Sequence, residues 1–328
     1  ARATRSIRGA GLVLRLIIQR FASACFTMAF IAVVVFGAVE LMPGNACTAY
    51  LGRDAKGAKL ASCEERLGLN RPALERFVEW AGGALQGDLG VSVQRGKPIT
   101  EMVGWRLRNT IILSAIAVLF GVPLAILLGV VAGLYRDRFP DMILSAGAIF
   151  AMTIPEFVSA TIMILVFAIG LGWASGIVTA GYKAPVLELA ASSVLPAATL
   201  TLVLTAHILR MVRSSVIDVL ASDYVLMARL KGVPFRRIVL RHVLPNSLLP
   251  AISVIGLTVA WLLGGAVVVE SVYNYPGLGR MAVDAVSDRD IPLVQAIALM
   301  VCGIYILANL ATDLLSLLLN PRLRTYRA

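Results

Sequence analysis

The sequence predicts an all-α, polytopic membrane protein with six transmembrane helices. Of its 328 residues, 59% are hydrophobic and 15% are charged, and the mean hydropathy is +0.84. Soluble globular chains average about 45–50% apolar and about 25% charged residues. This composition excludes an ordinary soluble domain and a disordered chain, so the long apolar stretches are interpreted as membrane spans.

Six stretches are apolar over the roughly 20 residues that a helix needs to cross a bilayer. They are Phe21–Val39, Asn109–Leu134, Met142–Ala174, Leu189–Leu209, Val243–Val269 and Ile291–Thr312. Basic residues precede the first stretch, as in a signal peptide, but it is longer than the roughly 7–15 apolar residues of such a peptide. The segment Pro43–Cys47 also lacks a good cleavage site. We therefore expect residues 21–43 to form a retained first transmembrane helix.

The distribution of basic residues predicts which loops face the cytoplasm. With the N-terminus inside, the inner segments hold 17 Lys and Arg against five Asp and Glu, whereas the outer segments hold 13 of each. The net charge of +11 therefore comes from the inner side, as the positive-inside rule expects. Residues 1–20 and 321–328 are then cytoplasmic, residues 44–108 are extracytoplasmic, and residues 109–320 form a transmembrane core with a cytoplasmic loop at 215–242. No basic surface is left to indicate a nucleic-acid partner.

The sequence offers little catalytic or metal-binding material. Its two histidines, His207 and His242, are 35 positions apart, and no cluster has the spacing of a zinc site. The segment Gly52–Lys59 approaches a phosphate-binding loop but lacks Gly-Lys-Ser/Thr after the four-residue spacer. We expect no enzyme activity, cofactor or metal in this chain, so any ATP-driven work would require a separate subunit.

Two of the four cysteines, Cys47 and Cys63, fall in the outer segment, where an oxidising compartment permits disulfides. Cys25 and Cys302 fall in predicted spans and suit a role as small packing residues. Because the sequence does not give the distance between the two outer thiols, it leaves open whether they are bonded.

The inner loop contains a predicted helix, a tight turn and a second helix. Ser222 or Asp223 can cap the first helix. Gly232 can end that helix in the left-handed conformation, and Pro234 can start the next one. The apolar face of the first helix comprises Tyr224, Met227, Ala228 and Leu230, of which the small Ala228 would permit close approach of another surface. One interpretation is an amphipathic helix on the anionic inner leaflet. The Gly-Pro break favours the other, a protruding knuckle that inserts into a protein groove.

A series of motifs runs through nearly the whole chain. The inner loop carries Asp223-Tyr224, Ala228, Lys231-Gly232, Arg236-Arg237 and Pro245-Asn246. The further motifs are Leu41–Gly44, Gly87–Gly90, Glu270–Arg280, Arg289–Gln295 and Asn320–Arg322. In this order they resemble the ABC-importer permeases of the dipeptide, oligopeptide and nickel family, whose cytoplasmic loop is of the EAA type. This chain has Asp223-Tyr224 where the broader loop consensus begins Glu-Ala-Ala.

The resemblance implies a type I ABC-importer permease fold in the bacterial inner membrane. It also implies a pathway for di- or oligopeptides delivered by an extracytoplasmic solute-binding protein, a second homologous permease subunit and two cytoplasmic ATPase subunits. Coupling to the ATPases would run through residues 223–237. The implied coupling residues are Asp223, Tyr224, Ala228, Lys231, Gly232, Arg236 and Arg237. Residues 44–108 would form a scoop-like structure that meets the binding protein, with a passive spacer as the alternative.

Two groups of residues are candidates for the pathway or its gate. Glu270, Tyr273, Pro276 and Gly277 follow the fifth span and suit an outer gate or docking loop, or else a re-entrant turn that caps the fifth and sixth spans. Glu156 lies in the third span, where an ionisable side chain should face a cavity or a partner. It would either contact the ammonium group of a peptide or make a structural hydrogen bond to a neighbouring span.

Other signals and other functions carry less weight. His207 is expected to be a packing residue, and Gly129 and Gly133 indicate a closely packed helix face. Nickel or metal-chelate uptake by the same family is an alternative, although no ligand cluster favours it. A stand-alone ion-coupled carrier would carry more intramembrane acids and inverted repeats, and a membrane enzyme would need catalytic residues at one depth. The sequence does not identify the cargo or say whether the two permeases are identical.

Overall fold

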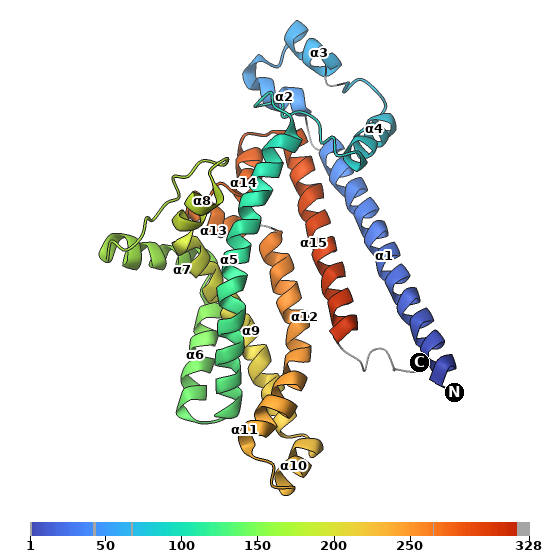
Figure 1. The fold of residues 1–328 in the computed structure, drawn as a ribbon. Coiled ribbons are helices and arrows are strands. Elements are labelled where there is room, and N and C mark those ends of the chain that lie inside the picture. The colour runs from blue at the N-terminus through green and yellow to red at the C-terminus, as the bar shows by residue number, and fades with distance from the viewer. Residues whose placement is uncertain (1, 42–43, 67, 265, 320–328) are drawn as a thin grey trace.

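The structure is a computed structural model that describes residues 2–41, 44–66, 68–264 and 266–319. Within these residues the chain is helical and has no strand, apart from one isolated bridge between Val91 and Pro98. The α-helices are α1 Arg2–Glu40, α2 Ala46–Leu51, α3 Gly57–Arg66, α4 Ala73–Leu85, α5 Ile99–Leu134, α6 Phe139–Thr153, α7 Glu156–Met163, α8 Val186–Ser192, α9 Val194–Leu220, α10 Asp223–Leu230, α11 Phe235–Ile238, α12 Leu244–Leu263, α13 Val267–Val272, α14 Leu278–Ser287 and α15 Ile291–Leu319. A 3₁₀-helix covers Gly52–Asp54, and π-helices at Ile164–Gly170 and Val239–Val243 continue α7 and α11. Figure 1 shows their arrangement. The expected tail at 321–328 and the motif Asn320–Arg322 lie outside the described residues.

The described helices confirm an all-α membrane protein with five long apolar helices, or six when one bent pair counts as a single span. The bent pair corrects the third predicted span. Residues 142–174 do not form one straight helix, because α6 and α7 meet at an angle of 107°. Pro155 has no backbone N–H and disfavours the helical conformation of the residue before it. Ile154 is accordingly extended, with φ −74° and ψ 127°, and Glu156 begins a new helix.

Other helix boundaries also differ from the apolar stretches. The second predicted span begins at Asn109, but α5 begins at Ile99. The fourth predicted span begins at Leu189, whereas α9 begins at Val194 and continues to Leu220, past Leu209. Hydropathy marks only the part of a helix that lipid can surround, while a helix continues wherever neighbouring helices pack against it. The fifth span is also interrupted, since α12 ends at Leu263 and α13 starts at Val267.

Helices α5 and α9 pack closely and form the centre of the bundle. A methyl group at Gly129 would lie 2.7 Å from Val212 Cβ and 2.8 Å from Leu209 O. One at Gly133 would lie 2.6 Å from Val216 Cγ1. These glycines therefore let the two backbones approach, as the Gly-x-x-x-Gly spacing indicates. The core around them also includes buried side chains from α7, α12 and α13.

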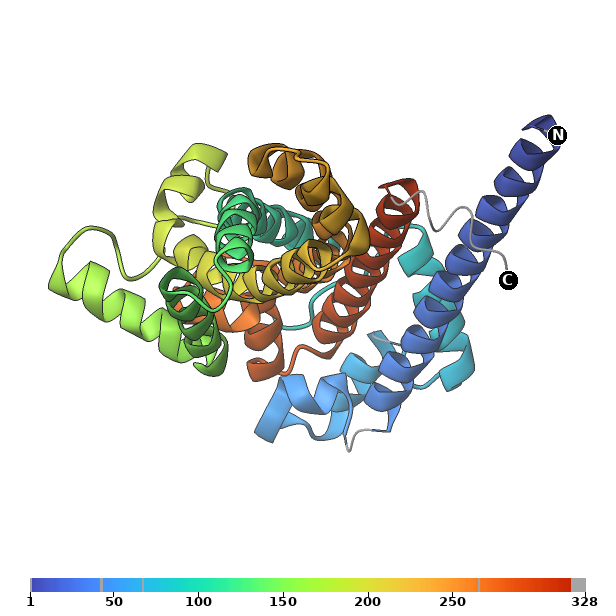
Figure 2. The ribbon, with the colours of Figure 1, turned by 90° about the horizontal axis from the view of Figure 1, so that it is seen from below.

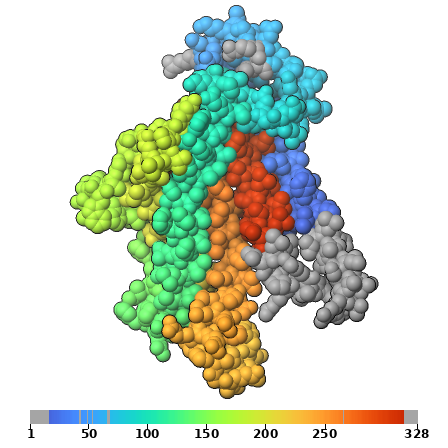
Figure 3. All heavy atoms as spheres, viewed as in Figure 1, coloured from blue at the N-terminus to red at the C-terminus, as the bar shows by residue number. Residues whose placement is uncertain are grey.

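The bundle has two distinct ends. Figure 1 shows α2, α3 and α4 at one end, and the α5–α6 turn, α10, α11 and the first residues of α1 at the other. Helix α1 stands at the edge and contacts α15 and, through Phe36, Phe77 and Trp80, α4. The view along the bundle in Figure 2 places α15 between α1 and the other long helices. The space-filling view in Figure 3 shows the segment of α10 and α11 projecting beyond the α5–α6 turn.

Candidate functional site

The projecting segment has the helix, turn and helix that the sequence predicts. Helix α10 follows Ser222, whose backbone is extended at the N-cap but whose side chain makes no capping bond. Gly232 has φ +73°, the left-handed conformation that L side chains rarely adopt. Pro234 then stands at the N-cap of α11. The chain therefore reverses within a few residues and leaves α10 as a knuckle at the end of the bundle.

One face of α10 fixes the knuckle to its own bundle. Val225 is fully buried, and the half-buried Ala228 and Val233 pack against the main core. The small Ala228 does permit a close approach, but the surface that it contacts belongs to the bundle of its own chain, and its predicted coupling role stays a prediction. The outward apolar side chains are Tyr224, Leu226, Met227 and Leu230.

The charged side chains around the knuckle point outward. Asp223, Lys231, Arg236 and Arg237 are all exposed, and within the described part of the chain they form no ion pair. Arg229 lies over the ring of Phe235, with its guanidinium carbon 5.8 Å from the ring centroid. Helix α10 is thus held on one side by its own bundle and exposes apolar side chains on the other, with mostly basic residues around them. An exposed apolar surface with a polar rim is typical of a protein-binding site.

A second constellation surrounds Glu270 at the opposite end of the fifth span. Glu270 is fully buried in α13 and accepts a hydrogen bond from Thr110 Oγ1 at 2.7 Å and one from Arg280 N at 3.0 Å. Thr110 Oγ1 in turn accepts from Leu278 N at 2.8 Å. The carboxylate and the hydroxyl thereby satisfy free backbone N–H groups at the start of α14. Gly277 leaves room for this, since a methyl group there would lie 2.3 Å from the carboxyl carbon.

Two tyrosines extend this buried network to other helices. Tyr273 Oη lies 2.8 Å from Thr199 Oγ1 of α9 and donates to Ala160 O of α7 at 3.1 Å. Tyr275 Oη donates to Asn109 O of α5 at 2.7 Å. The side chain of Asn109 donates back to Pro276 O at 2.9 Å. The network therefore joins α5, α7, α9, α13 and α14.

The network also holds the loop between α7 and α8. Asn274 Nδ2 donates to Val178 O at 3.0 Å, and Asn109 Nδ2 donates to Tyr182 O at 3.0 Å. At the rim of this loop, Lys183 Nζ lies 2.9 Å from Glu101 Oε1, and this hydrogen bond raises the pKa of the Lys183 ammonium group. The motif after the fifth span thus cross-links the loop and the helices around it.

The four residues that the sequence predicts as a gate do not have the exposed surroundings expected of residues that line a pathway. Glu270 and Tyr273 are buried inside the chain, and Pro276 and Gly277 form the turn that they stabilise. Sequence reasoning missed Asn109 and Thr110, although two polar residues at the start of a long apolar stretch were a visible signal. The gate role itself stays a prediction.

Glu156 and His207 do not join this network. Glu156 is half-buried at the first position of α7, and among the described residues it makes no hydrogen bond to a neighbouring span. His207 is exposed on α9, with its Nδ1 2.9 Å from Val203 O one turn earlier. The expectation of a packing role for His207 is therefore not supported by burial, and the role of Glu156 stays a prediction.

The outer segment forms a small helical cap. Cys47 in α2 and Cys63 in α3 are joined by a disulfide, and Asn45 Nδ2 donates to Glu64 Oε1 at 2.6 Å. The loop that leads into α5 is tied to the start of α15, where the buried Asp290 accepts from Ser92 Oγ and from Val93 N. A cleft of about 1,170 Å³ lies between this loop, α1, α4 and the start of α15.

A bundle of long apolar helices with a projecting knuckle at one end and a helical cap at the other is the architecture of a multi-pass membrane protein. The chain belongs to the family of binding-protein-dependent transport system inner membrane components, which matches residues 125–325. The N-terminal region of that family matches residues 13–114. The protein is therefore a multi-pass protein of the bacterial inner membrane and the permease component of an ABC transport system, which works with ATPase and binding-protein partners.

Relatives match over nearly the whole chain. A probable peptide ABC transporter permease from Sinorhizobium fredii is 34% identical over 311 residues, covering 94% of this chain and 98% of the relative. The glutathione transport system permease protein GsiC of Escherichia coli strain K12 is 32% identical over 312 residues, covering 95% and 99%. GsiC of Salmonella choleraesuis is 33% identical over the same length.

Proposed function

We propose that this chain forms the translocation pathway for di- or oligopeptides in an ATP-driven importer. The support is the similarity to a peptide permease and to glutathione permeases over more than nine-tenths of the chain. Glutathione is itself a small peptide, so both names describe one class of cargo. Nickel or metal-chelate uptake is less supported, because the described residues contain no group of three metal-ligating side chains.

The proposed complex contains this chain, a second homologous permease, two ATPase subunits and a binding protein. We place the end that carries α10 and α11 in the cytoplasm, because the excess basic residues lie at this end. The helical cap would then face the binding protein. ATP and Mg²⁺ would be bound by the ATPase subunits.

The observation that carries the coupling proposal is the two-sided character of α10. Val225 and Ala228 seat the helix on the bundle, while Met227 and Leu230 face away from it. A helix held on one side can transmit the movement of a partner that grips the other side. The coupling role of Asp223, Lys231, Arg236 and Arg237 would be to contact the polar rim of the ATPase groove.

The test compares two leucines that are equally exposed at opposite ends of the molecule. Leu230 on α10 and Leu74 on α4 each have 74% of their surface exposed. We expect Leu230→Asp to reduce the amount of ATPase that copurifies with the permease, because it places a charge in the apolar contact. Leu74→Asp should copurify as much ATPase as the unchanged chain. Equal ATPase recovery with both variants would contradict the coupling proposal.

The cargo is tested separately with the complete complex in proteoliposomes. Uptake of a radiolabelled dipeptide should require the binding protein on the side of the membrane to which the peptide is added. It should also require ATP on the opposite side, where the ATPase subunits lie. Uptake of a nickel chelate without uptake of any peptide would contradict the peptide assignment and leave the coupling result unaffected.

A further inference from the structure

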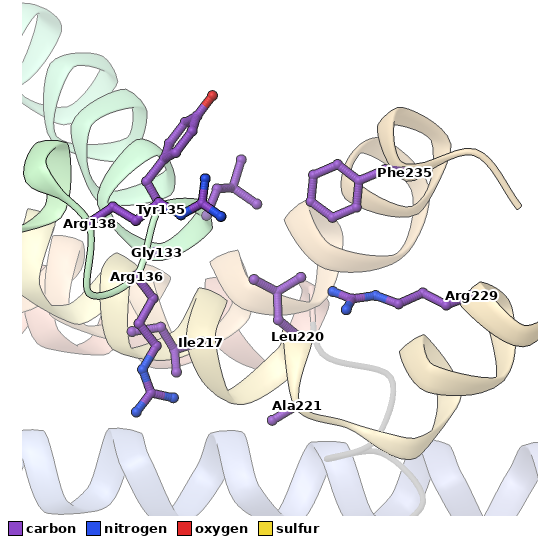
Figure 4. A pocket seen from close by; sticks show the side chains of 10 residues that line it. Gly133, Tyr135, Arg136, Arg138, Ile217, Leu220, Ala221, Arg229 and Phe235 are labelled. Carbon is purple, nitrogen blue, oxygen red and sulfur yellow. The ribbon is translucent and has the colours of Figure 1, made fainter.

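A hollow at the knuckle end of the bundle combines an apolar floor with basic side chains. Its volume is about 570 Å³, and it lies between the α5–α6 turn, the last turn of α9 and the helices α10 and α11. Figure 4 shows Tyr135, Arg136 and Arg138 on one side, Arg229 and Phe235 on the other, and Leu220 between them. We infer that this hollow, here named the basic pocket, binds the phosphate headgroup of an anionic phospholipid.

The charge of the basic pocket fits an anionic ligand. Its lining contains Arg136, Arg138 and Arg229 and no Asp or Glu. Arg136 contacts Asp137, with 3.2 Å between Nε and Oδ2, but both side chains are largely exposed, so this pair is weak. Within the described residues, Arg138 and Arg229 form no ion pair. Arginine offers several N–H donors in one plane, which suits the oxygens of a phosphate group.

The depth of the pocket fits a lipid headgroup. Leu134 ends the apolar stretch of α5, and it lines the floor together with Leu220 of the last turn of α9. The end of the apolar stretch of a membrane helix marks the boundary between the hydrocarbon core and the headgroups. Acyl chains could therefore follow the exposed apolar surface of the bundle while the phosphate reached the arginines. Tyr135 stands on the same rim, at the level where tyrosines commonly meet the headgroups.

The pocket also spans two parts of the chain, since α5 and α6 do not pack against α10 or α11 to any substantial extent. Arg136 and Arg138 belong to the α5–α6 turn, whereas Arg229 and Phe235 belong to the knuckle. A phosphate held between them would brace the knuckle against the bundle. The bilayer would thereby contribute to the position of α10, in addition to the apolar seat formed by Val225.

The test measures lipid binding to the purified full-length chain by native mass spectrometry. The probes are phosphatidylglycerol, phosphatidylcholine and inorganic phosphate. We expect bound phosphatidylglycerol in excess over phosphatidylcholine, and an affinity about a hundredfold lower in Arg136→Gln/Arg138→Gln/Arg229→Gln, at about 1 kcal/mol for each arginine. The matched control, Arg236→Gln/Arg237→Gln/Arg241→Gln, removes the same charge from the same end and should keep the preference.

Several results would overturn the inference. Equal losses in the two triple variants would show that only bulk charge attracts the lipid. Competition by millimolar inorganic phosphate would show that the pocket recognises free phosphate and not a lipid. Loss of the bound lipid when the ATPase subunits are added would show that protein occupies the pocket in the assembled complex. Circular dichroism of both triple variants controls for folding, since their arginines are exposed and no loss of helix is expected.

Discussion

Replacement of Glu270 by Ala tests whether the buried carboxylate holds the start of α14 against α5. Without the carboxylate, the hydroxyl of Thr110 and the backbone N–H of Arg280 lose their acceptors, which lie 2.7 Å and 3.0 Å away. Each orphaned buried donor costs about 1–3 kcal/mol, so we expect the free energy of unfolding to fall by about 2–6 kcal/mol. With an unfolding entropy of about 2.1 cal/mol/K per residue, this corresponds in a chain of 328 residues to a decrease in Tm of roughly 3–9 °C.

A second substitution separates the charge from the hydrogen bonds. Glu270→Gln keeps one oxygen to accept from Arg280 N, and its amide can donate to Thr110 Oγ1, which has two lone pairs and already accepts from Leu278 N. The hydroxyl of Thr110 then loses the acceptor that Glu270 Oε1 provided, so one buried donor is orphaned instead of two, at a cost of about 1–3 kcal/mol. The control is Glu188→Ala, because Glu188 is exposed on α8 and its removal should change stability by less than about 0.5 kcal/mol.

The assay is thermal unfolding of the purified full-length protein in detergent, followed by tryptophan fluorescence. The expected order of Tm is unchanged chain and Glu188→Ala highest, Glu270→Gln lower, and Glu270→Ala lowest. If Glu270→Ala unfolds at the same temperature as Glu188→Ala, or if Gln destabilises more than Ala, then the network does not hold α14 in the way described.

Two further predictions concern packing and the outer cap. In Gly129→Ala, the added methyl group meets backbone and side-chain atoms of α9, which lowers the free energy of unfolding by about 1–3 kcal/mol. In Gly104→Ala on the same helix, the added methyl group has no neighbour within 4 Å, and the better helix propensity of Ala should raise the free energy of unfolding by about 0.5–1 kcal/mol. A Tm for Gly129→Ala as high as that for Gly104→Ala would refute the close approach of α5 and α9. For the disulfide between Cys47 and Cys63, alkylation under denaturing conditions should modify two cysteines without reductant and four after reduction, as read by intact mass. Modification of four without reductant would refute the bond.

The sequence was most informative where one local rule decides the conformation. Gly232 and Pro234 indicated the turn between α10 and α11, because one residue favours positive φ and the other starts a helix. The apolar stretches located the long helices for the same reason, since a bilayer imposes a minimum length. Pro155 was also visible in the sequence, but a proline inside an apolar run predicts either a kink or a break, and only the packing of α7 on α9 and α13 decides between them.

The sequence was less informative where contacts between distant segments decide. Ala228 lies on the apolar side of α10, but periodicity does not say which apolar residues face the bundle. The network of Glu270 joins residues more than 150 positions apart, so no local pattern reports it. The polar pair Asn109 and Thr110 could have been singled out, yet its partners could not.

Helix α1 differs from α9 in what surrounds it. In the most apolar part of its span from Ile17 to Glu40, 6% of the residues are buried inside the chain, compared with 61% for α9. Lipid accepts any apolar side chain of suitable length, whereas a packed interior selects for shape. Exchange of one apolar residue for another should therefore be tolerated wherever lipid and not a partner subunit covers α1, and poorly along α9. Among related permeases, the first helix is then free to diverge in sequence while keeping its hydropathy. The rate of substitution at each position should therefore distinguish helices that face lipid from helices that face protein.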